Sequence, residues 1–282
     1  MRLLFLGDIV GAPGLALVRR AVPILRAAEK LDLVIANAEN VAGGAGITPG
    51  QYRHLRAAGV DAVTLGDHVY KKFDIADVLA DPAEPAVKPA NFPQSAPGKD
   101  HAVVTAADGT RVAALSLLGR TYMKAVDCPF AAADRVLAAL PADVKVIVVD
   151  MHAEATADKY LMAHHLDGRV TVVLGTHTHV PTADEQLLAG GTAFQCDVGM
   201  CGPHDGILGR RVDRVLAAAR TAVPHAFDVS LGDVRLCGAI VDCDAATGKA
   251  TTLRRVTWRE AEIEELTTKA QRPYEGPPRE QI

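Results

Sequence analysis

The chain has 282 residues, of which 49% are hydrophobic, so it is long enough to bury a large core within one domain. The formal net charge is −4 and the 30 lysine and arginine residues are scattered, which excludes a strong nucleic-acid-binding signature but allows single nucleotides as ligands. Five cysteines without a C-x-x-C pair argue against a disulfide scaffold and favour a reducing compartment.

The N-terminal third alternates between short apolar runs and segments with helical spacing. MRLLFLGDIVG is too short an apolar segment for a secretory signal, and no later run approaches a membrane span, so we expect a cytoplasmic protein without membrane contact. The runs LLFLG, LDLVIAN and VDAVTLG predict strands, and residues 14–30, 48–59 and 71–80 predict helices. Pro23 predicts a kink or break in the first of these helices. The alternation is typical of βαβ units in a mainly parallel sheet.

The remaining two thirds mix parallel and antiparallel signals. Residues 101–119 read as two strands around an Asp-Gly turn, which predicts a hairpin. A strand at VKVIVVD, a helix from about Thr156 to Leu166 and a strand at TVVLG follow. A helix near Arg210 to Ala219 precedes a second hairpin-like pair, DVRLCGAIVDCD and GKATTLRRVTW.

Together these elements predict an α/β fold on the border with α+β, built from two mixed β-sheets flanked by helices. We expect one domain over residues 1–270 and a frayed, polar and proline-rich tail over residues 271–282. The sequence is compatible with a small homo-oligomer.

Polar side chains follow five of the predicted strands, at or just past the point where each strand ends. They are Asp8, Glu39 with Asn40, Asp67 with His68, His152, and His177 with His179. The carboxyl ends of parallel strands gather along one edge of a sheet, so we expect these groups to converge. Burying them unpaired would cost several kcal/mol each, and bound metal ions would offset that cost.

Nitrogen and oxygen ligands without a thiolate suit manganese, iron or zinc. Eight side chains exceed the needs of one ion, which predicts two ions about 3.5–4 Å apart that share a carboxylate.

Six motifs lie between residues 1 and about 260: GDIVGAPG, ANAENVAGGAGIT, TLGDHVY, DMHAEATADK, GTHTHVPTAD and DVGMCGP. They resemble the calcineurin-like metallophosphoesterase superfamily, and within it the bacterial YmdB-like branch of 2′,3′-cyclic-nucleotide 2′-phosphodiesterases. The resemblance implies a four-layer sandwich of two sheets between helices, and hydrolysis of a small phosphodiester such as a cyclic nucleotide. It also implies two metal ions, iron and/or manganese, with zinc as the alternative.

At matching positions the resemblance implies a role for each polar residue. One metal would be held by Asp8, Glu39, Asn40 and His179, and the other by Glu39, Asp67, His152 and His177. Glu39 would bridge the two ions, and a hydroxide between them would attack phosphorus in line. His68 would be the general acid that protonates the leaving oxygen.

Two positions depart from the patterns of these proteins. The superfamily has Asp-x-His at its first motif, whereas the third residue here is Val10, so Asn40 is expected to replace the missing imidazole. The branch usually has asparagine before the histidine of its Gly-Asn-His motif, whereas this chain has Asp67. The extra charge should bind a cation more tightly, but it removes an amide donor that could orient substrate.

Two other functions use similar residues. Amidohydrolase barrels also contain His-x-His, but there the pair follows the first strand and here it follows a late one. A metal-loaded regulatory or RNA-associated protein with weak turnover is the second alternative. His68 beside Asp67 favours catalysis, since metal retention alone needs no acid at that position.

Several further polar residues have two readings. Asp150 could orient His152, or it could only cap a strand end. Asn91, Arg120 and His204 lie in predicted loops and could contact substrate, but surface hydrogen bonds would explain them equally well.

Overall fold

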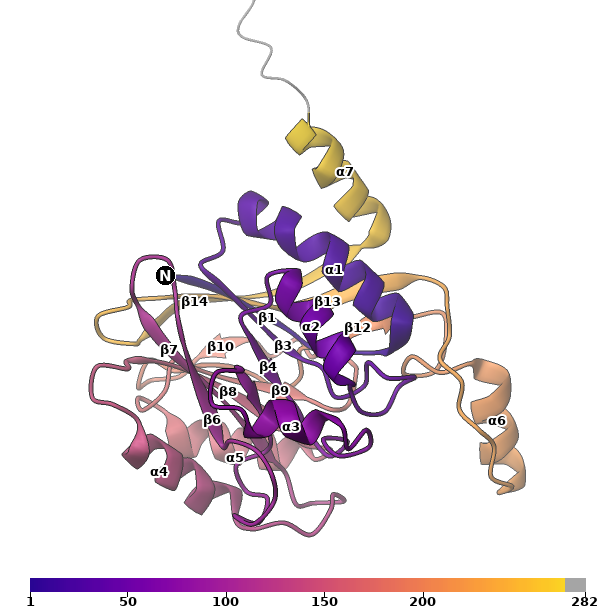
Figure 1. Ribbon diagram of the computed structural model, residues 1–282, viewed down its shortest axis with the longest axis horizontal. Coiled ribbons are helices and arrows are strands. Elements are labelled where there is room, and N and C mark those ends of the chain that lie inside the picture. The colour runs from indigo at the N-terminus through magenta and orange to yellow at the C-terminus, as the bar shows by residue number, and fades with distance from the viewer. Residues whose placement is uncertain (272–282) are drawn as a thin grey trace, which may run out of the picture.

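Two β-sheets made of buried apolar strands face each other, and helices cover their outer faces (Figure 1). We describe them from a computed structural model, which covers residues 1–271. Side chains of both sheets form the inner apolar layer, among them Leu3, Phe5, Leu33, Ile35, Val112, Val148, Val172 and Leu174. Two further apolar cores lie on the outer sides of the sheets, one between each sheet and the helices that cover it.

The first sheet has the strand order β2-β12-β13-β1-β3-β4-β5, with β14 paired to β13. Its strands are β1 (Arg2–Leu6), β2 (Asp8–Ile9), β3 (Leu33–Asn37), β4 (Ala62–Thr64), β5 (Ala86–Val87), β12 (Met200–Pro203), β13 (Val234–Cys243) and β14 (Ala250–Arg259). Strands β1, β3, β4 and β5 are parallel, whereas β13 runs antiparallel to β1, β12 and β14. The β13–β14 pair confirms the second predicted hairpin.

The second sheet has the order β10-β11-β9-β8-β7-β6. Its strands are β6 (His101–Thr105), β7 (Arg111–Leu118), β8 (Val146–His152), β9 (Val172–Thr176), β10 (Gln186–Leu187) and β11 (Ala193–Gln195). Strands β7, β8, β9 and β11 are parallel, and the edge strands β6 and β10 are antiparallel to their neighbours. Both sheets are therefore mixed, and the β6–β7 pair confirms the first predicted hairpin.

Helices complete four layers, in the order helix, sheet, sheet, helix. The helices are α1 (Gly11–Ala28), α2 (Pro49–Ala57), α3 (Ile75–Ala80), α4 (Pro129–Ala139), α5 (Thr156–Leu166), α6 (Val212–Thr221) and α7 (Glu260–Gln271). Helix α1 packs on β12 and β13 and contacts α2 and α7, while α4 and α5 pack on β7, β8 and β9. Helix α6 projects from the body and has no buried residue (Figure 1). The predicted fold class is confirmed.

Some element boundaries differ from the prediction. Helix α1 continues through Pro23, which lies on the exposed face of the helix and lacks the backbone N–H that would bond to the Arg19 carbonyl. Helix α3 begins at Ile75 because residues 71–74 form turns after His68. Helices α4 and α7 were not predicted, although Pro129 at the first turn of α4 is a recognisable start signal.

Helix α7 extends to Gln271, the first residue of the predicted tail, and the rest of that tail, residues 272–282, lies outside the described residues. None of the helices in residues 1–271 combines the length and the apolar character needed to cross a bilayer.

Candidate metal centre

All the polar residues predicted at the strand ends lie at one place, where the carboxyl ends of strands from both sheets meet. Asp8 begins β2 just after β1, Glu39 and Asn40 follow β3, and Asp67 with His68 follow β4 in the first sheet. The second sheet supplies His152 at the end of β8, and His177 and His179 after β9. The site is thus the junction of two facing sheets, and not the edge of one sheet as the sequence pattern suggested.

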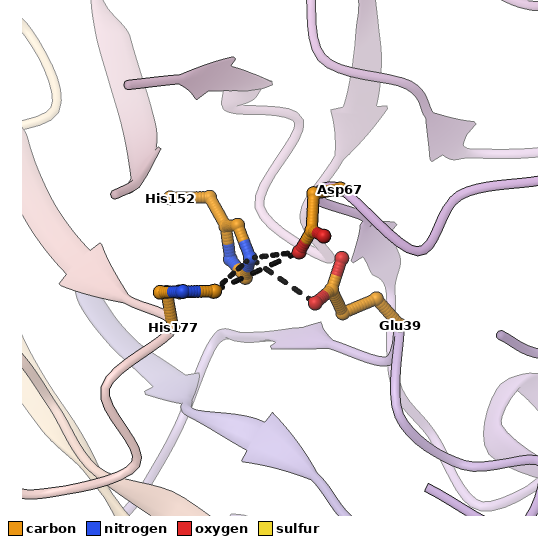
Figure 2. A group of neighbouring side chains, drawn as sticks. All are labelled: Glu39, Asp67, His152 and His177. Carbon is orange, nitrogen blue, oxygen red and sulfur yellow. Dashed lines mark hydrogen bonds and ion pairs between the residues drawn. The ribbon is translucent and has the colours of Figure 1, made fainter. Parts of the chain in front are cut away.

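Four of these side chains form one compact group, Glu39, Asp67, His152 and His177. One potential ligand atom from each lies within 4.8 Å of the others. Figure 2 shows the two imidazoles and the two carboxylates turned toward one another. His152 Nε2 lies 3.1 Å from Glu39 Oε1 and 3.4 Å from Asp67 Oδ1, and His177 Nδ1 lies 3.1 Å from His152 Nε2. This donor set matches the ligand chemistry of manganese, iron or zinc.

A second group surrounds the side-chain amide of Asn40. Asn40 Nδ2 lies 3.3 Å from Asp8 Oδ1, 3.4 Å from Glu39 Oε1 and 3.3 Å from His179 Nε2. Val10 forms a backbone bridge to Asn40, so the amide lies next to the position where the superfamily motif has its histidine. Glu39 belongs to both groups.

Burial of these acids changes their proton affinities. Burial raises the pKa of Asp8 to about 6, although His179 and His152 oppose the shift. Burial alone would lower the pKa of His152, but the neighbouring charges and hydrogen bonds of Glu39 and Asp67 raise it well above its usual value. Without a metal, the cluster therefore holds a proton on His152 that compensates part of the carboxylate charge.

A buried chain of hydrogen bonds orients His152. Its Nδ1 lies 2.8 Å from Thr176 Oγ1, and the Thr176 hydroxyl donates to Asp150 Oδ1 at 2.6 Å. Asp150 Oδ2 also accepts from Thr64 Oγ1 at 2.5 Å and from Asn37 Nδ2 at 2.9 Å. The chain directs Nε2 of His152 toward Glu39 and Asp67, as hydrogen-bonded partners of metal-binding histidines commonly do.

The sequence pattern identified Asp150 as a candidate for this orienting role but missed Thr176. The only local signal for Thr176 is its position between the glycine and the first histidine of GTHTH.

The other histidines are oriented by separate contacts. Nε2 of His177 lies 3.3 Å from Glu154 Oε2, which leaves Nδ1 facing the cluster. Nδ1 of His179 lies 3.1 Å from the Leu208 carbonyl oxygen, which leaves Nε2 facing Asp8 and Asn40. Each of these two rings therefore presents one ring nitrogen to the predicted metal positions.

His68 lies at the mouth of the site and is not part of the compact group. Its backbone N–H donates to Glu39 Oε2 at 2.9 Å, its Nδ1 lies 2.8 Å from Asn40 Oδ1, and its Nε2 lies 3.7 Å from Asp67 Oδ2. Its side chain is 28% exposed, compared with 0% for His152. The ring is therefore accessible to a ligand, while the backbone of His68 is bonded to the Glu39 carboxylate.

A cavity of about 290 Å³ opens onto this cluster. It is lined by Glu39, Asn40, Gly44, His68, Glu154, His177, Thr178, His179, Leu208 and Arg210. A larger cavity of about 490 Å³ lies beside Lys88 and Asp100, but it contains none of the clustered ligands. The smaller cavity is therefore the candidate functional site, because its lining contains potential metal ligands and the lining of the larger cavity does not.

Three residues considered for substrate contact do not line this cavity. Asn91 is buried and bonds to the backbone of Leu118 and Asp127, and the His204 ring bonds to the Gly202 carbonyl. Arg120 is exposed, and its backbone N–H donates to Asp158. Asn91 and His204 therefore make hydrogen bonds within the fold, and those of Asn91 are buried and not at the surface as the sequence analysis suggested.

Comparisons with known proteins give a consistent result. Residues 4–256 match a family model described as YmdB-like protein. The chain is 42% identical over 256 residues to a 2′,3′-cyclic-nucleotide 2′-phosphodiesterase of Bacillus subtilis, covering 91% of this chain and 96% of that protein.

Two solved structures are also similar. A hypothetical protein from Thermus thermophilus has a TM-score of 0.86 and 40% identity, covering 92% of this chain and 100% of that one. A novel phosphatase from Mycoplasma pneumoniae has a TM-score of 0.83 and 29% identity, covering 94% and 96%.

Packing at Gly66 gives a first test of the cluster. A Cβ atom at this position would overlap His152 Cδ2 and Nε2 and Glu39 Oε2. We expect Gly66→Ala to displace both ligands and to abolish metal uptake, measured by elemental analysis of the purified protein. Gly50→Ala in α2 is the matched control, because its Cβ would meet only Thr48 Oγ1 at 4.0 Å. Equal metal content in the two variants would contradict the proposed ligand positions.

Proton release gives a second test. A metal must displace the proton that the raised pKa places on His152, and it requires Asp8 ionised, whose pKa is about 6. Metal affinity should therefore fall as the pH falls through 6, and loading at neutral pH should release protons. Titration calorimetry in two buffers of different ionisation enthalpy measures this release. Affinity that is flat between about pH 5 and 8, with no proton release, would count against this description.

Proposed function

Because the chain belongs to the YmdB-like family, we propose that it is a two-metal phosphodiesterase that hydrolyses 2′,3′-cyclic nucleotides. The observation that carries the proposal is the pair of ligand groups that share Glu39 at the junction of the two sheets. The name of the Bacillus subtilis relative supports the substrate class, since the similarity covers 96% of that protein.

The donor set fits two ions. Glu39, Asp67, His152 and His177 would hold one, and Asp8, Glu39, Asn40 and His179 would hold the other. When bound, such ions lower the pKa of the attacking water and neutralise charge on the phosphoryl oxygens. The chain's contribution is to fix these ligands in a buried site, where Asp8 and Glu39 are at most 1% exposed.

His68 is proposed as the group that protonates the leaving oxygen. Positioned proton transfer is needed because an alkoxide is a poor leaving group, and histidine is suited to this near neutral pH. Asn40 connects this acid to the metal ligands, since its amide lies between His68 Nδ1 and the Asp8–His179 pair.

Metal binding through Asn40 would require its side-chain amide to turn over. Here Nδ2 faces Asp8 Oδ1 and His179 Nε2, while Oδ1 lies 2.8 Å from His68 Nδ1. Ligation through Oδ1 would exchange the two ends of the amide, which have nearly the same shape.

The cavity favours a small substrate. Its volume of about 290 Å³ is at the low end for ligand sites, and eight of its ten lining residues are charged or polar. Two of them are the carboxylates Glu39 and Glu154, so bound cations would supply the attraction for an anionic substrate. Arg210 lies on this wall and donates to the carbonyl oxygens of Gly43 and Gly44, which fixes the glycine loop after Asn40.

A substrate panel tests the function. Protein reconstituted with manganese or iron should hydrolyse 2′,3′-cyclic AMP in preference to 3′,5′-cyclic AMP and an aryl phosphodiester, and a chelator should abolish the activity. Chromatography identifies the product, which should carry the phosphate on the 3′ oxygen. Two bound metals without turnover of any of the three compounds would instead support the regulatory alternative.

His68→Ala tests the acid. We expect kcat to fall about 10²- to 10⁴-fold while both metals are retained, because His68 is not a proposed ligand. His54→Ala, at an exposed position in α2, is the matched control and should leave both quantities unchanged. Metal loss in His68→Ala would show that the ring supports the ligands, and unchanged kcat would remove it from the mechanism.

A further inference from the structure

We propose that a buried ion pair, Lys159 with Asp197, positions His177 and His179 for metal binding. The inference deepens the proposed function and rests on the metal centre described above. It gives a role to the aspartate of the motif DVGMCGP, which the ligand groups do not use.

The pair lies deep behind the site. Lys159 projects from α5 with a fully buried side chain, and Asp197, between β11 and β12, is 1% exposed. Lys159 Nζ donates to Asp197 Oδ2 at 2.7 Å. Two charges buried this completely need mutual neutralisation, so neither side chain is free to move without the other.

Asp197 reaches the histidine loop through Thr178, the residue between His177 and His179. Its Oδ2 accepts from the Thr178 backbone N–H at 3.1 Å and from the Thr178 hydroxyl at 2.8 Å. The carboxylate therefore holds both the backbone and the side chain of the residue that joins the two proposed ligands.

The loop needs such a restraint because its backbone is strained. His177 has φ 96° and His179 has φ 66°. Both values lie in the positive-φ region, which residues other than glycine rarely adopt. Conformations of this kind persist only when surrounding contacts fix them. The Thr178 contacts to Asp197, together with the His177 N–H bond to Asp8 Oδ2 at 2.9 Å, provide these contacts.

Asp197 is a positioning residue and not an additional metal ligand. Its Oδ2 already accepts from Lys159 and twice from Thr178, and its Oδ1 accepts from the Gly199 N–H at 2.8 Å. Lys159 neutralises the carboxylate, so the acid can lie close behind the site without attracting a cation of its own.

Three substitutions test the inference, with one matched control. Asp197→Asn removes the charge, Lys159→Met removes its partner, and Thr178→Val removes only the hydroxyl contact to Asp197. The control is Lys88→Met, because Lys88 is 1% exposed and pairs with Asp100 beside the larger cavity, away from the cluster. Each protein is titrated with Mn²⁺ by calorimetry, the paired ions are followed by their electron-paramagnetic-resonance spectrum, and the melting temperature is recorded.

We expect Asp197→Asn and Lys159→Met to bind Mn²⁺ about 10- to 100-fold more weakly and to lose the spectrum of a coupled ion pair. Thr178→Val should show a smaller loss in the same direction. Lys88→Met should melt at a lower temperature yet keep wild-type affinity and spectrum, which separates positioning from general destabilisation. If the Asp197 and Lys159 variants fail to fold, the Mn²⁺ affinity of Thr178→Val alone tests the inference.

Two results would overturn the inference alone, provided that wild-type protein binds two ions. The first is wild-type Mn²⁺ affinity in Thr178→Val and in every folded variant of the Lys159–Asp197 pair. The second is a loss of affinity in Lys88→Met as large as the loss in the Lys159–Asp197 variants. Wild-type protein that takes up no Mn²⁺ would instead overturn the proposed metal centre, and this inference with it.

Discussion

The structure depends on the concentration of negative charge at one buried point. Asp8, Glu39 and Asp67 bring three carboxylates together where two sheets meet, and Asp8 and Glu39 are nearly inaccessible to solvent. Among residues 1–268, whose side chains the structure describes, the one lysine or arginine nitrogen within 4.0 Å of these carboxylates is Lys124 Nζ, at 4.0 Å from Asp67 Oδ2. A proton on His152 compensates only part of the charge, so the arrangement is explained best by bound cations.

The face-to-face packing of the two sheets makes this concentration of carboxylates possible. The inner apolar layer holds the sheets face to face, and each sheet contributes part of the cluster from the carboxyl ends of its parallel strands. Glu39 then joins ligands of the first sheet to His152 of the second. A single sheet edge could not surround two ions from both sides, whereas this junction places acids opposite imidazoles.

Much of the fold and of the candidate site was predictable from the sequence. The rest depends on contacts between residues far apart in the chain, which leave no local pattern. Short apolar runs ending in Asp, Glu or His predicted which polar side chains gather at one place, because strand ends are marked locally. The face-to-face packing of the two sheets was implied by the family resemblance and not by any local pattern, since no local pattern says which faces pack together. Thr176 supports His152 only because the β8–β9 register places these two residues side by side, and Lys159 meets Asp197 only through tertiary packing.

The most direct measurement of the central claim is anomalous X-ray scattering from a crystal of protein loaded with manganese or iron. Two peaks about 3.5–4 Å apart are predicted, separated by the Glu39 carboxylate. One peak should lie at bonding distance from Asp67, His152 and His177, and the other from Asp8, Asn40 and His179. A fully loaded crystal with no ion among these residues, or with its ions bound elsewhere on the protein, would contradict the account.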